Sequence, residues 1–487
     1  MNRPLRRVAL ACLVLFALLL GQANWVQVVK ARGYRDDPRN RRVLLRTYDT
    51  ERGAIVVGTG SARTVIARST ITTDQLKYLR TYPGGAEYAP VTGFASLVYG
   101  FSGVERVEND VLSGEDSRLL VRRLSDYITG RKVAGGSVVL TLDPRAQRAA
   151  YRGLAGKVGA VVALDPRTGA VLAMATSPSY DPTVLSSHQP SKIRDAYGRL
   201  VDDPLDPLVN RAVERTYPPG STFKLITTAA ALAAGYTPDR RIPSPTVLDL
   251  PGTTADLGNF GGERCGNGRT TTLADALRIS CNTAYGGLGL ALGDAKLRAQ
   301  AEAFGFGSSG LRLPQRVATS VFPDDLTRAQ VAQSAIGQFD VRVTPLEMAM
   351  VAAGIANGGE VMRPYLVKQV LAPDLSALSL ASPSVLSRAV SSQVAQLLTS
   401  MMELVVTSGT GTRARIPGVR VAGKTGTAQH QLGEPPHAWF VGFAPANDPQ
   451  VAVAVLVEDG GNLGSDATGG KVAAPIAKAV MQAVLGG

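Results

Sequence analysis

Hydrophobic positions are concentrated most strongly at the start of the chain. Three arginines within the first seven residues precede an unbroken apolar run over residues 8–20. This length fits the apolar core of a signal peptide. An extension to Val29 gives 22 residues, about 33 Å of helix, which is enough to cross a bilayer. Because arginines on the short side keep that end in the cytoplasm, both interpretations place the bulk of the chain outside the cytoplasmic membrane.

Residues 31–155 are polar and interrupted by glycine, with short β-rich runs such as GAIVVGTG and GSVVLTLD. One helix is expected near their end, in TLDPRAQRAAYRGL, with Asp143 as its N-cap and Pro144 at the first helical position. The pattern predicts an elongated module that mixes strands and helices.

A change of pattern near residue 156 marks the start of a larger domain, residues 156–487. Its first segment, GAVVALDPRTGAVLAMATS, places two apolar runs around turn residues and predicts a β-hairpin. A helical pattern starts at Ser221 and stops at Gly235, which suits the position after a helix C-cap. TTTLADALRISCNTAYGGLGLAL predicts one or two further helices.

The remaining pattern is expected to complete one sheet. TPLEMAMVAAGIANGG starts with a capping-box pattern, in which Thr344 caps, Pro345 is the first helical residue and Glu347 reaches back. After residue 419, VRVAGKTGTAQH, AWFVGFAPA and QVAVAVLVED predict three strands, and AAPIAKAVMQAVL predicts an amphipathic helix. A hairpin, a helical middle, three strands and a final helix give one sheet with helices on its faces, an α+β fold.

Composition and charge narrow the classes of function. The 487 residues carry a net charge of +13, mostly from scattered arginines. A nucleic-acid stripe would be more concentrated, so no nucleic-acid partner is expected. A basic surface facing solvent, or facing anionic lipid or wall polymer, fits better. Three histidines, without Cys-x-x-Cys or His-Glu-x-x-His, argue against a zinc enzyme, and neither a metal nor another cofactor is expected.

Candidate chemistry begins at YPPGSTFK, where Ser221 and Lys224 are three residues apart. On a helix this spacing puts both side chains on one face. A serine hydroxyl needs a base to become a nucleophile, and a lysine can serve when burial and neighbouring cations lower its pKa. Taken alone, the pair is better explained as a helix cap followed by a surface lysine.

Two further motifs reverse this balance. RISCNTA contains Ser280 and Asn282, and VAGKTGTAQH contains the segment 424–427 on a predicted strand. The glycine of this segment would let an extended substrate lie against the strand. Together and in this order, the motifs match the three that β-lactamases and penicillin-binding proteins share. The catalytic interpretation of Ser221 is therefore preferred.

The whole chain resembles a class B penicillin-binding protein, most closely the actinobacterial elongation type. The resemblance is carried by YPPGSTFK, SCNTA, SIGQFDVRVTPLEMA, KTGTA and PPHAWFVGFAPA, and by Arg52, Gly53 and Ile55 as an Arg-Gly-x-Ile signature. It implies a transpeptidase domain of the penicillin-binding and serine β-lactamase type at residues 156–487, with an antiparallel sheet and helices on its faces. Before it would lie a non-penicillin-binding pedestal module, residues 31–155, and a retained single-pass anchor, residues 1–30.

The resemblance also implies a role for each motif residue. Ser221 would attack the penultimate D-Ala carbonyl of a peptidoglycan stem peptide, and Lys224 would take its proton. Ser280 would pass a proton to the leaving nitrogen, Lys424 would keep the local potential positive, and Asn282 would hold Lys224 and the substrate amide.

The strand motif is expected to hold the substrate. Thr425 and Thr427 would bind its terminal carboxylate, with Gly426 between them. The backbone N–H groups of Ser221 and Thr427 would form an oxyanion hole. An amine of a neighbouring stem would then resolve the acyl-enzyme, whereas β-lactams would trap the same serine.

Other classes of protein fit less well. A class A β-lactamase needs a Glu base for water attack, and residues 308–323 contain no acid. A bifunctional enzyme would need a glycosyltransferase segment with a Glu-Asp-x-x-Phe pattern, which the sequence lacks. A SEDS-type glycosyltransferase is therefore expected as a partner in the membrane. A non-catalytic scaffold or β-lactam sensor, and a D,D-carboxypeptidase on the same residues, stay open.

The three cysteines divide into two groups. Cys12 lies in the N-terminal apolar run, whereas Cys265 and Cys281 are expected outside the membrane, where disulfides persist. A bond between these two would close a short loop onto the second motif. Two separate buried thiols are the alternative, and the sequence does not decide between them.

Overall fold

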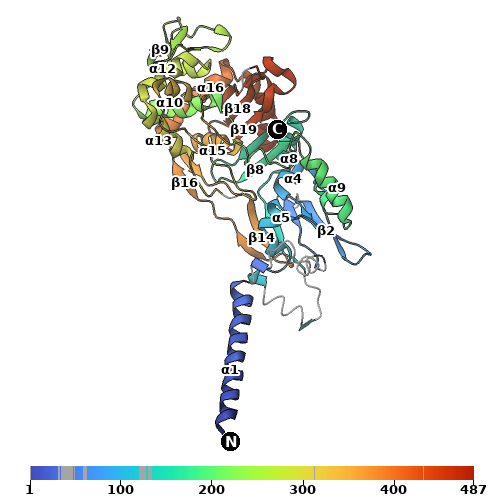
Figure 1. The fold of residues 1–487 in the computed structure, drawn as a ribbon. Coiled ribbons are helices and arrows are strands. Elements are labelled where there is room, and N and C mark those ends of the chain that lie inside the picture. Colours follow the sequence, from blue (N-terminus) through green and yellow to red (C-terminus); the bar gives the residue numbers. More distant parts are fainter. Residues whose placement is uncertain are drawn as a thin grey trace.

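The computed structural model describes residues 2–30, 33–34, 48, 50–58, 63–119, 128–129, 134–311, 313–430 and 433–486. Within them the chain forms an N-terminal apolar helix, a module of strands and short helices, and a large domain around a five-stranded sheet (Figure 1).

The apolar N-terminal run is one long helix. α1 (Asn2–Asn24) continues into a π-helical turn, η1 (Trp25–Val29), and Figure 1 shows it projecting from the rest of the chain. The stretch Arg3–Val29 is long and apolar enough to cross a membrane, and its most apolar window is fully exposed. An apolar helix that stays exposed in the described part of the chain is suited to lipid.

A six-stranded sheet forms the N-terminal module, in the order β15-β14-β6-β1-β2-β3. Its strands are β1 (Ile55–Val57), β2 (Thr64–Ile71), β3 (Tyr78–Thr81), β6 (Ser137–Leu140), β14 (Val367–Leu371) and β15 (Ala377–Leu380). β1 and β6 are parallel, and the other pairs are antiparallel. Two of these strands come from the later part of the chain, a contribution that the sequence pattern did not predict.

The other elements of the module are α4 (Gly85–Thr92), β4 (Ala95–Ser96), β5 (Gly100–Phe101), α5 (Gly103–Val107), α6 (Asn109–Leu112) and η3 (Ser117–Leu119). Glu105 of α5 is fully buried, and its carboxylate oxygens each accept a 2.6 Å bond, one from Nε of Arg52 and one from Nε of Arg80. Burial alone would raise the pKa of Glu105, but the two guanidinium groups hold it below its usual range. The first residue of the Arg-Gly-x-Ile signature therefore holds the module together, because a buried carboxylate needs cationic partners.

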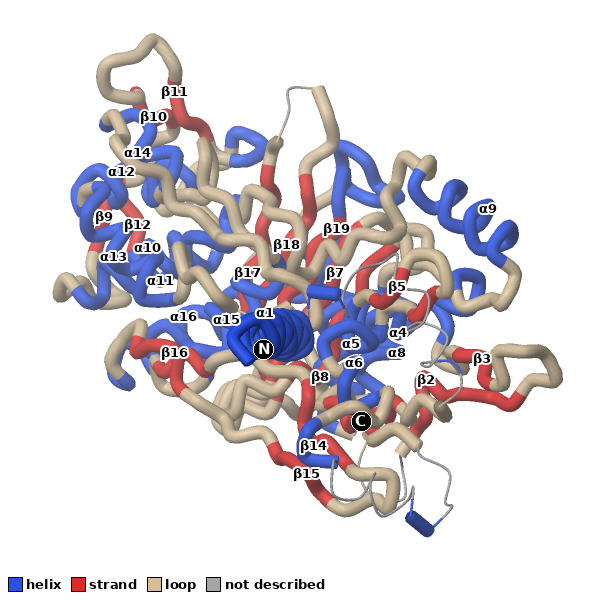
Figure 2. Tube along the Cα trace, turned by 60° about the horizontal axis from the view of Figure 1, so that its bottom comes forward, coloured by secondary structure: helices blue, strands red, loops and turns tan. Residues whose placement is uncertain are grey.

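The large domain is built on an antiparallel sheet in the order β17-β18-β19-β7-β8. Its strands are β7 (Gly159–Leu164), β8 (Val171–Ser177), β17 (Ala422–Ala428), β18 (His437–Ala444) and β19 (Val451–Val457). The predicted hairpin and the three predicted strands are confirmed and join as expected. Figure 2 shows β17, β18 and β19 side by side from a second direction.

Helices cover both faces of this sheet. Val161 and Val453 pack with α8 (Pro144–Gly153) and α17 (Gly469–Leu485), whereas neighbouring strand residues pack with α15 (Pro345–Ala356). This alternation follows from the two-residue repeat of a strand. The predicted α+β arrangement is confirmed.

A helical layer lies beside the sheet and carries two of the three motifs. It contains η5 (Gly220–Phe223), α10 (Lys224–Ala233), α11 (Leu273–Arg278), α12 (Asn282–Leu292), α13 (Asp294–Phe304), α14 (Arg328–Ser334) and α16 (Ser392–Ser408). Two further elements, η4 (Pro182–Leu185) and α9 (Pro190–Val201), lie apart from this layer and pack on the N-terminal module (Figure 1). Short elements lie between the helices: β9 (Arg241–Pro243), β10 (Val247–Asp249), β11 (Asp256–Gly258), η6 (Phe260–Gly262), β12 (Thr270–Thr272), β13 (Glu360–Met362) and β16 (Val385–Arg388). Two more lead to or from the sheet: η7 (Thr412–Ala414) joins α16 to β17, and η8 (Glu458–Asp466) joins β19 to α17. Residues Lys224–Leu232 of α10 are all buried, so the helix is a rigid support for the turn before it.

Two helix-end predictions are confirmed. The Asp143 carboxylate accepts from the backbone N–H groups of Arg145 and Ala146 at the start of α8. Gly235 has φ +85° and follows the C-cap of α10, where the hydrogen bonds of a Schellman motif close the helix.

Two other predictions about helix ends are wrong. Ser221 does not begin an α-helix but lies in the 3₁₀ turn η5, because Gly220 and the prolines before it set a tighter bend. Thr344 does cap α15, but Glu347 does not reach back, because the backbone N–H of Thr344 donates to Oγ of Ser320 instead. Glu347 is buried, and burial raises its pKa to about 8.

Candidate active site

The turn that carries Ser221 is pressed against strand β17. Gly220 has φ +51°, and a Cβ at this position would lie 2.8 Å from the Thr427 carbonyl oxygen. The Gly220 N–H donates to the Gly337 carbonyl at 2.9 Å, and Nε1 of Trp439 donates to the Pro218 carbonyl at 3.0 Å. Only glycine combines this backbone conformation with so close an approach. The bend therefore presents Ser221, which is partly exposed, beside β17.

Lys224 follows one turn later and is completely buried. Its Nζ donates to Oδ1 of Asn282 and to the carbonyl oxygen of Ser280, both at 2.7 Å, and lies 3.3 Å from Oγ of Ser280. Ser280 has φ +65°, an uncommon conformation for a non-glycine residue. This turn aims both its carbonyl and its hydroxyl at the lysine.

Lys424 approaches the same serine from the sheet. Its Nζ lies 2.8 Å from Oγ of Ser280 and 2.8 Å from the Thr425 carbonyl oxygen. The Ser280 hydroxyl therefore bridges the two lysine side chains. The fold brings together all three motifs, which are separated along the chain by 59 residues (221 to 280) and 144 residues (280 to 424).

The electrostatics of the two lysines follow from their burial. Burial, and then the charge of Lys424, lower the pKa of Lys224 well below its usual range. Burial alone lowers the pKa of Lys424 to about 7. The described residues place no carboxylate within ion-pair distance of either amine, so no negative charge opposes the lowering of the Lys224 pKa, and its neutral form is favoured relative to that of an exposed lysine.

The strand motif lies on β17, which is an edge strand of the sheet. Oγ1 of Thr425 is 2.6 Å from Oγ1 of Thr410, and Thr427 is partly exposed. A Cβ on Gly426 would lie 2.9 Å from Cγ2 of Thr222. The glycine is therefore required where the serine turn packs on the strand, whereas the sequence argument assigned it to close approach of substrate.

Cys265 and Cys281 are joined by a disulfide, with Cα atoms 6.1 Å apart and a sequence separation of 16. The bond ties the loop after β11 to the residue between Ser280 and Asn282. Cys12 is free and exposed on α1.

Asn259 in this loop was missed by the sequence reasoning. Its Oδ1 accepts from the backbone N–H groups of Asn282 at 2.8 Å and Thr283 at 3.1 Å, so it caps α12 from outside the helix. The neighbouring carbonyl of Gly258 accepts from Nδ2 of Asn282 at 3.1 Å. One signal was available, since Cys281 precedes the helix and its side chain makes no cap bond. The partner, 23 residues away, was not visible in the pattern.

Three potential metal ligands lie together near the end of β17, the start of β18 and the end of β19. Ligand atoms of His430, His437 and Asp459 lie within 4.8 Å of one another. The two imidazole rings are stacked, with centroids 4.0 Å apart and planes 6° apart. Metal ligation needs in-plane lone pairs that converge on one point, and parallel rings do not provide this. Burial lowers the pKa of His437 to about 4.

The fold and this constellation of residues correspond to a known class. The chain matches the family "Penicillin binding protein transpeptidase domain" over residues 159–482 and the family "Penicillin binding protein A dimerisation domain" over residues 52–138. It belongs to the penicillin-binding proteins with a transpeptidase domain, as its motifs implied.

Relatives within this class cover the whole chain. It is 50% identical to peptidoglycan D,D-transpeptidase PbpA of Mycolicibacterium smegmatis, over 100% of this chain and 99% of the relative. It is 48% identical to PbpA of Mycobacterium tuberculosis, over 100% of both. The ceftriaxone acyl-enzyme of penicillin-binding protein A from M. tuberculosis is similar in structure, with a TM-score of 0.88 at 46% identity over 91% of this chain and 100% of that one. The penicillin G acyl-enzyme of the same protein gives a TM-score of 0.85 at 47% identity, over 90% and 100%. The expected penicillin-binding fold is confirmed.

Proposed function

We propose that the chain is a peptidoglycan D,D-transpeptidase that cross-links stem peptides through an acyl-enzyme on Ser221. The observation that carries the proposal is the buried Lys224, one turn after Ser221, with a lowered pKa and direct contacts to Ser280 and Asn282. The relatives' names and their β-lactam acyl-enzymes support the same chemistry. Penicillin would react with the same hydroxyl.

Acylation begins with removal of the serine proton. Neutral Lys224 takes the proton as Oγ of Ser221 bonds to the carbonyl carbon of the penultimate D-Ala. The backbone N–H groups of Ser221 and Thr427 stabilise the resulting oxyanion. The close contact of Gly220 with Thr427 supports this pairing, because it holds the two segments side by side. A preorganised donor of this kind is worth about 3–4 kcal/mol.

Collapse of the intermediate breaks the C–N bond to the terminal D-Ala. The proton on Lys224 passes through the Ser280 hydroxyl to the leaving nitrogen, since Oγ of Ser280 contacts both amines. Lys424 supplies positive potential, and Asn282 holds Lys224 and the substrate amide. An amine of a neighbouring stem then attacks the ester, a peptide bond forms, and Ser221 regains its proton.

The β17 edge is the proposed substrate strand. Thr425 and Thr427 bind the terminal carboxylate, with Gly426 between them. An edge strand has free backbone groups that an extended peptide can pair with, as in β-strand addition. Because Thr410 holds the Thr425 hydroxyl at 2.6 Å, that side chain is already oriented.

Labelling with a fluorescent penicillin tests the nucleophile. The wild-type chain is expected to take up one label per molecule, and Ser221→Ala none. Ser186→Ala is a suitable control, because this buried serine lies outside the three motifs. A non-catalytic scaffold would remain unlabelled in the wild type. Product analysis with and without an acceptor amine separates transpeptidation from D,D-carboxypeptidase activity.

Membrane topology and domain division follow the same proposal. Residues 1–30 form a cytoplasmic tail and a retained single-pass anchor, residues 31–155 the pedestal module and residues 156–487 the transpeptidase domain outside the membrane. α8 precedes the last boundary but packs on α17, so in space it belongs with the transpeptidase domain.

We expect a SEDS-type glycosyltransferase as the membrane partner, since the sequence contains no glycosyltransferase segment of its own. Affinity capture of the full chain from its own membranes, followed by mass spectrometry, is expected to recover such a polytopic protein. A chain whose residues 1–30 are replaced by an unrelated anchor is the control. The pairing would be contradicted if the full chain and the control recovered the same membrane proteins and neither recovered a glycosyltransferase.

A further inference from the structure

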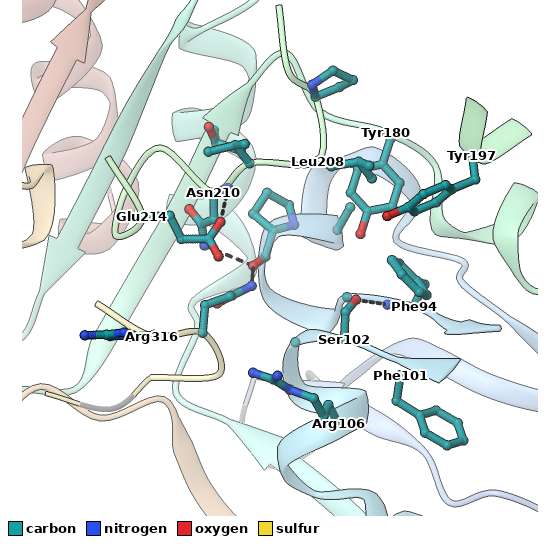
Figure 3. Close-up of a pocket in the computed structure, with 18 residues that line it drawn as sticks. Phe94, Phe101, Ser102, Arg106, Tyr180, Tyr197, Leu208, Asn210, Glu214 and Arg316 are labelled. Atoms are coloured by element: carbon teal, nitrogen blue, oxygen red, sulfur yellow. Dashed lines mark hydrogen bonds between the residues drawn. The ribbon is translucent and has the colours of Figure 1, made fainter. Parts of the chain in front are cut away.

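A cavity of about 450 Å³ lies between the N-terminal module and the transpeptidase domain (Figure 3). We call it the junction pocket. Its walls come from residues 89–106 of the module and from residues 176–214 and 315–316 of the large domain. None of the motif residues lines it, so it is separate from the candidate active site. Its volume is in the range of small-molecule sites.

Two guanidinium groups lie on one side of the junction pocket. Arg106 comes from α5 and Arg316 from the loop before α14, and Figure 3 shows both below Glu214 in that view. Among the described residues no carboxylate lies within ion-pair distance of either, and the charge of Arg106 acts on Glu214 only from farther away, where it partly offsets the rise in the Glu214 pKa that burial causes. A planar guanidinium is well suited to binding a carboxylate through two hydrogen bonds. This side of the pocket is therefore prepared for an anionic group.

Hydrogen-bond acceptors lie beside the arginines. One oxygen of Glu214, Oε2, accepts from the backbone N–H of Asn210 at 2.7 Å. Gln315 donates through Nε2 to the Pro90 carbonyl, and its Oε1 is buried without a partner. An unpaired buried acceptor is unfavourable, and a bound donor would remove this cost. A carboxylate and an unpaired carbonyl together suit an ammonium group.

The remaining wall is aromatic. Phe94 and Tyr180 pack edge to face with ring centroids 6.4 Å apart, and Tyr197 lies next to Tyr180 in Figure 3. Such a wall binds apolar side chains through buried area. Glu214 disfavours a simple anion, because its own charge would repel one.

We propose that the junction pocket binds a short peptide that carries both a free amino group and a free carboxylate. Glu214 and Gln315 take the ammonium group, Arg106 and Arg316 take the carboxylate, and the aromatic wall takes the side chains between them. This site does not depend on acylation of Ser221.

Binding can be tested with tetra-alanine and three capped forms of it, acetylated at the N-terminus, amidated at the C-terminus, or both. The full-length protein in detergent is first treated with penicillin G, so that the active site is occupied, and is then titrated by calorimetry. Tetra-alanine is expected to bind saturably, and each cap is expected to weaken binding about tenfold, the size of one charge-assisted hydrogen-bond pair. The proposal is overturned if no saturable binding occurs up to about 10 mM, or if doubly capped peptide binds equally well.

Variants place the binding at this pocket. In Glu214→Gln, acetylation of the peptide is expected to lose its effect while amidation keeps it. In the double variant Arg106→Gln, Arg316→Gln, amidation is expected to lose its effect instead. Arg363→Gln, at an exposed arginine outside the pocket, is the matched control. If both cap effects persist in the pocket variants, the peptide binds elsewhere and the proposal fails. Because the capped peptides test the wild type, a variant that does not fold leaves the first test intact.

Discussion

Removal of the Cys265–Cys281 disulfide is expected to lower the free energy of unfolding of the transpeptidase domain. The size of this loss depends on the number of residues in the loop that the bond closes. The bond closes a loop of 16 residues. In the chain-entropy description, a crosslink over a loop of this size stabilises the folded state by about 3 kcal/mol, because it restricts the unfolded chain. For a domain of this size, that loss corresponds to a fall in melting temperature of about 5 °C.

The measurement is differential scanning calorimetry of the full chain in detergent. The double variant Cys265→Ser, Cys281→Ser is compared with the wild type and with Cys12→Ser, which removes the free cysteine on α1. The transition of the large domain is expected to move down in the double variant and to stay in place in Cys12→Ser. Acylation by penicillin at 25 °C is expected to persist, because the hydrogen bonds that Asn259 accepts from the start of α12 remain. On heating, acylation should be lost earlier than in the wild type.

Two results would refute this reasoning. Equal melting temperatures for the double variant and the wild type would mean that the loop is equally restricted without the bond. Two free thiols in the native wild type, found by alkylation and mass spectrometry, would mean that the bond does not form.

Three further predictions concern the candidate active site. Gly220→Ala is expected to abolish most penicillin labelling, because its Cβ would lie 2.8 Å from the Thr427 carbonyl oxygen. Gly235→Ala is the control, since Gly235 also has a positive φ but lies in open space. This control should lose only about 1–2 kcal/mol of stability and should still be labelled. Asn259→Ala is expected to lower the free energy of unfolding by about 1 kcal/mol, because the cap of α12 is lost, and to slow acylation by penicillin. Asn259→Asp should recover much of the stability and much of the acylation rate. Equal acylation rates for the two variants would contradict the positioning role of Asn259. The acylation rate constant should rise with pH on the acid side, because Lys224 acts when neutral and its pKa is lowered. It should fall above about pH 7, where Lys424 loses its charge. A rate constant that does not change with pH would contradict both assignments.

The local sequence determined the chemistry-bearing segments and the elements that carry them. The hairpin 159–177, the three later strands, the Asp143 cap and the Gly235 helix end were all predictable, because hydrophobic repeat, turn residues and caps act over a few positions. The three motifs were recognisable because their order and spacing together are specific.

Contacts between distant segments were decided only by the tertiary structure. Asn259 caps α12 from another loop, β14 and β15 complete the sheet of the N-terminal module, and Gly426 makes room for Thr222. The side chain of Glu347 points inward because Ser320 takes the backbone N–H that it was expected to bind. Each of these depends on which surfaces meet after folding, and a periodic pattern along one segment carries no information about its partner. Ser221 and Lys224 could therefore be named from the sequence, whereas the position of Ser280 between two buried lysines required the fold.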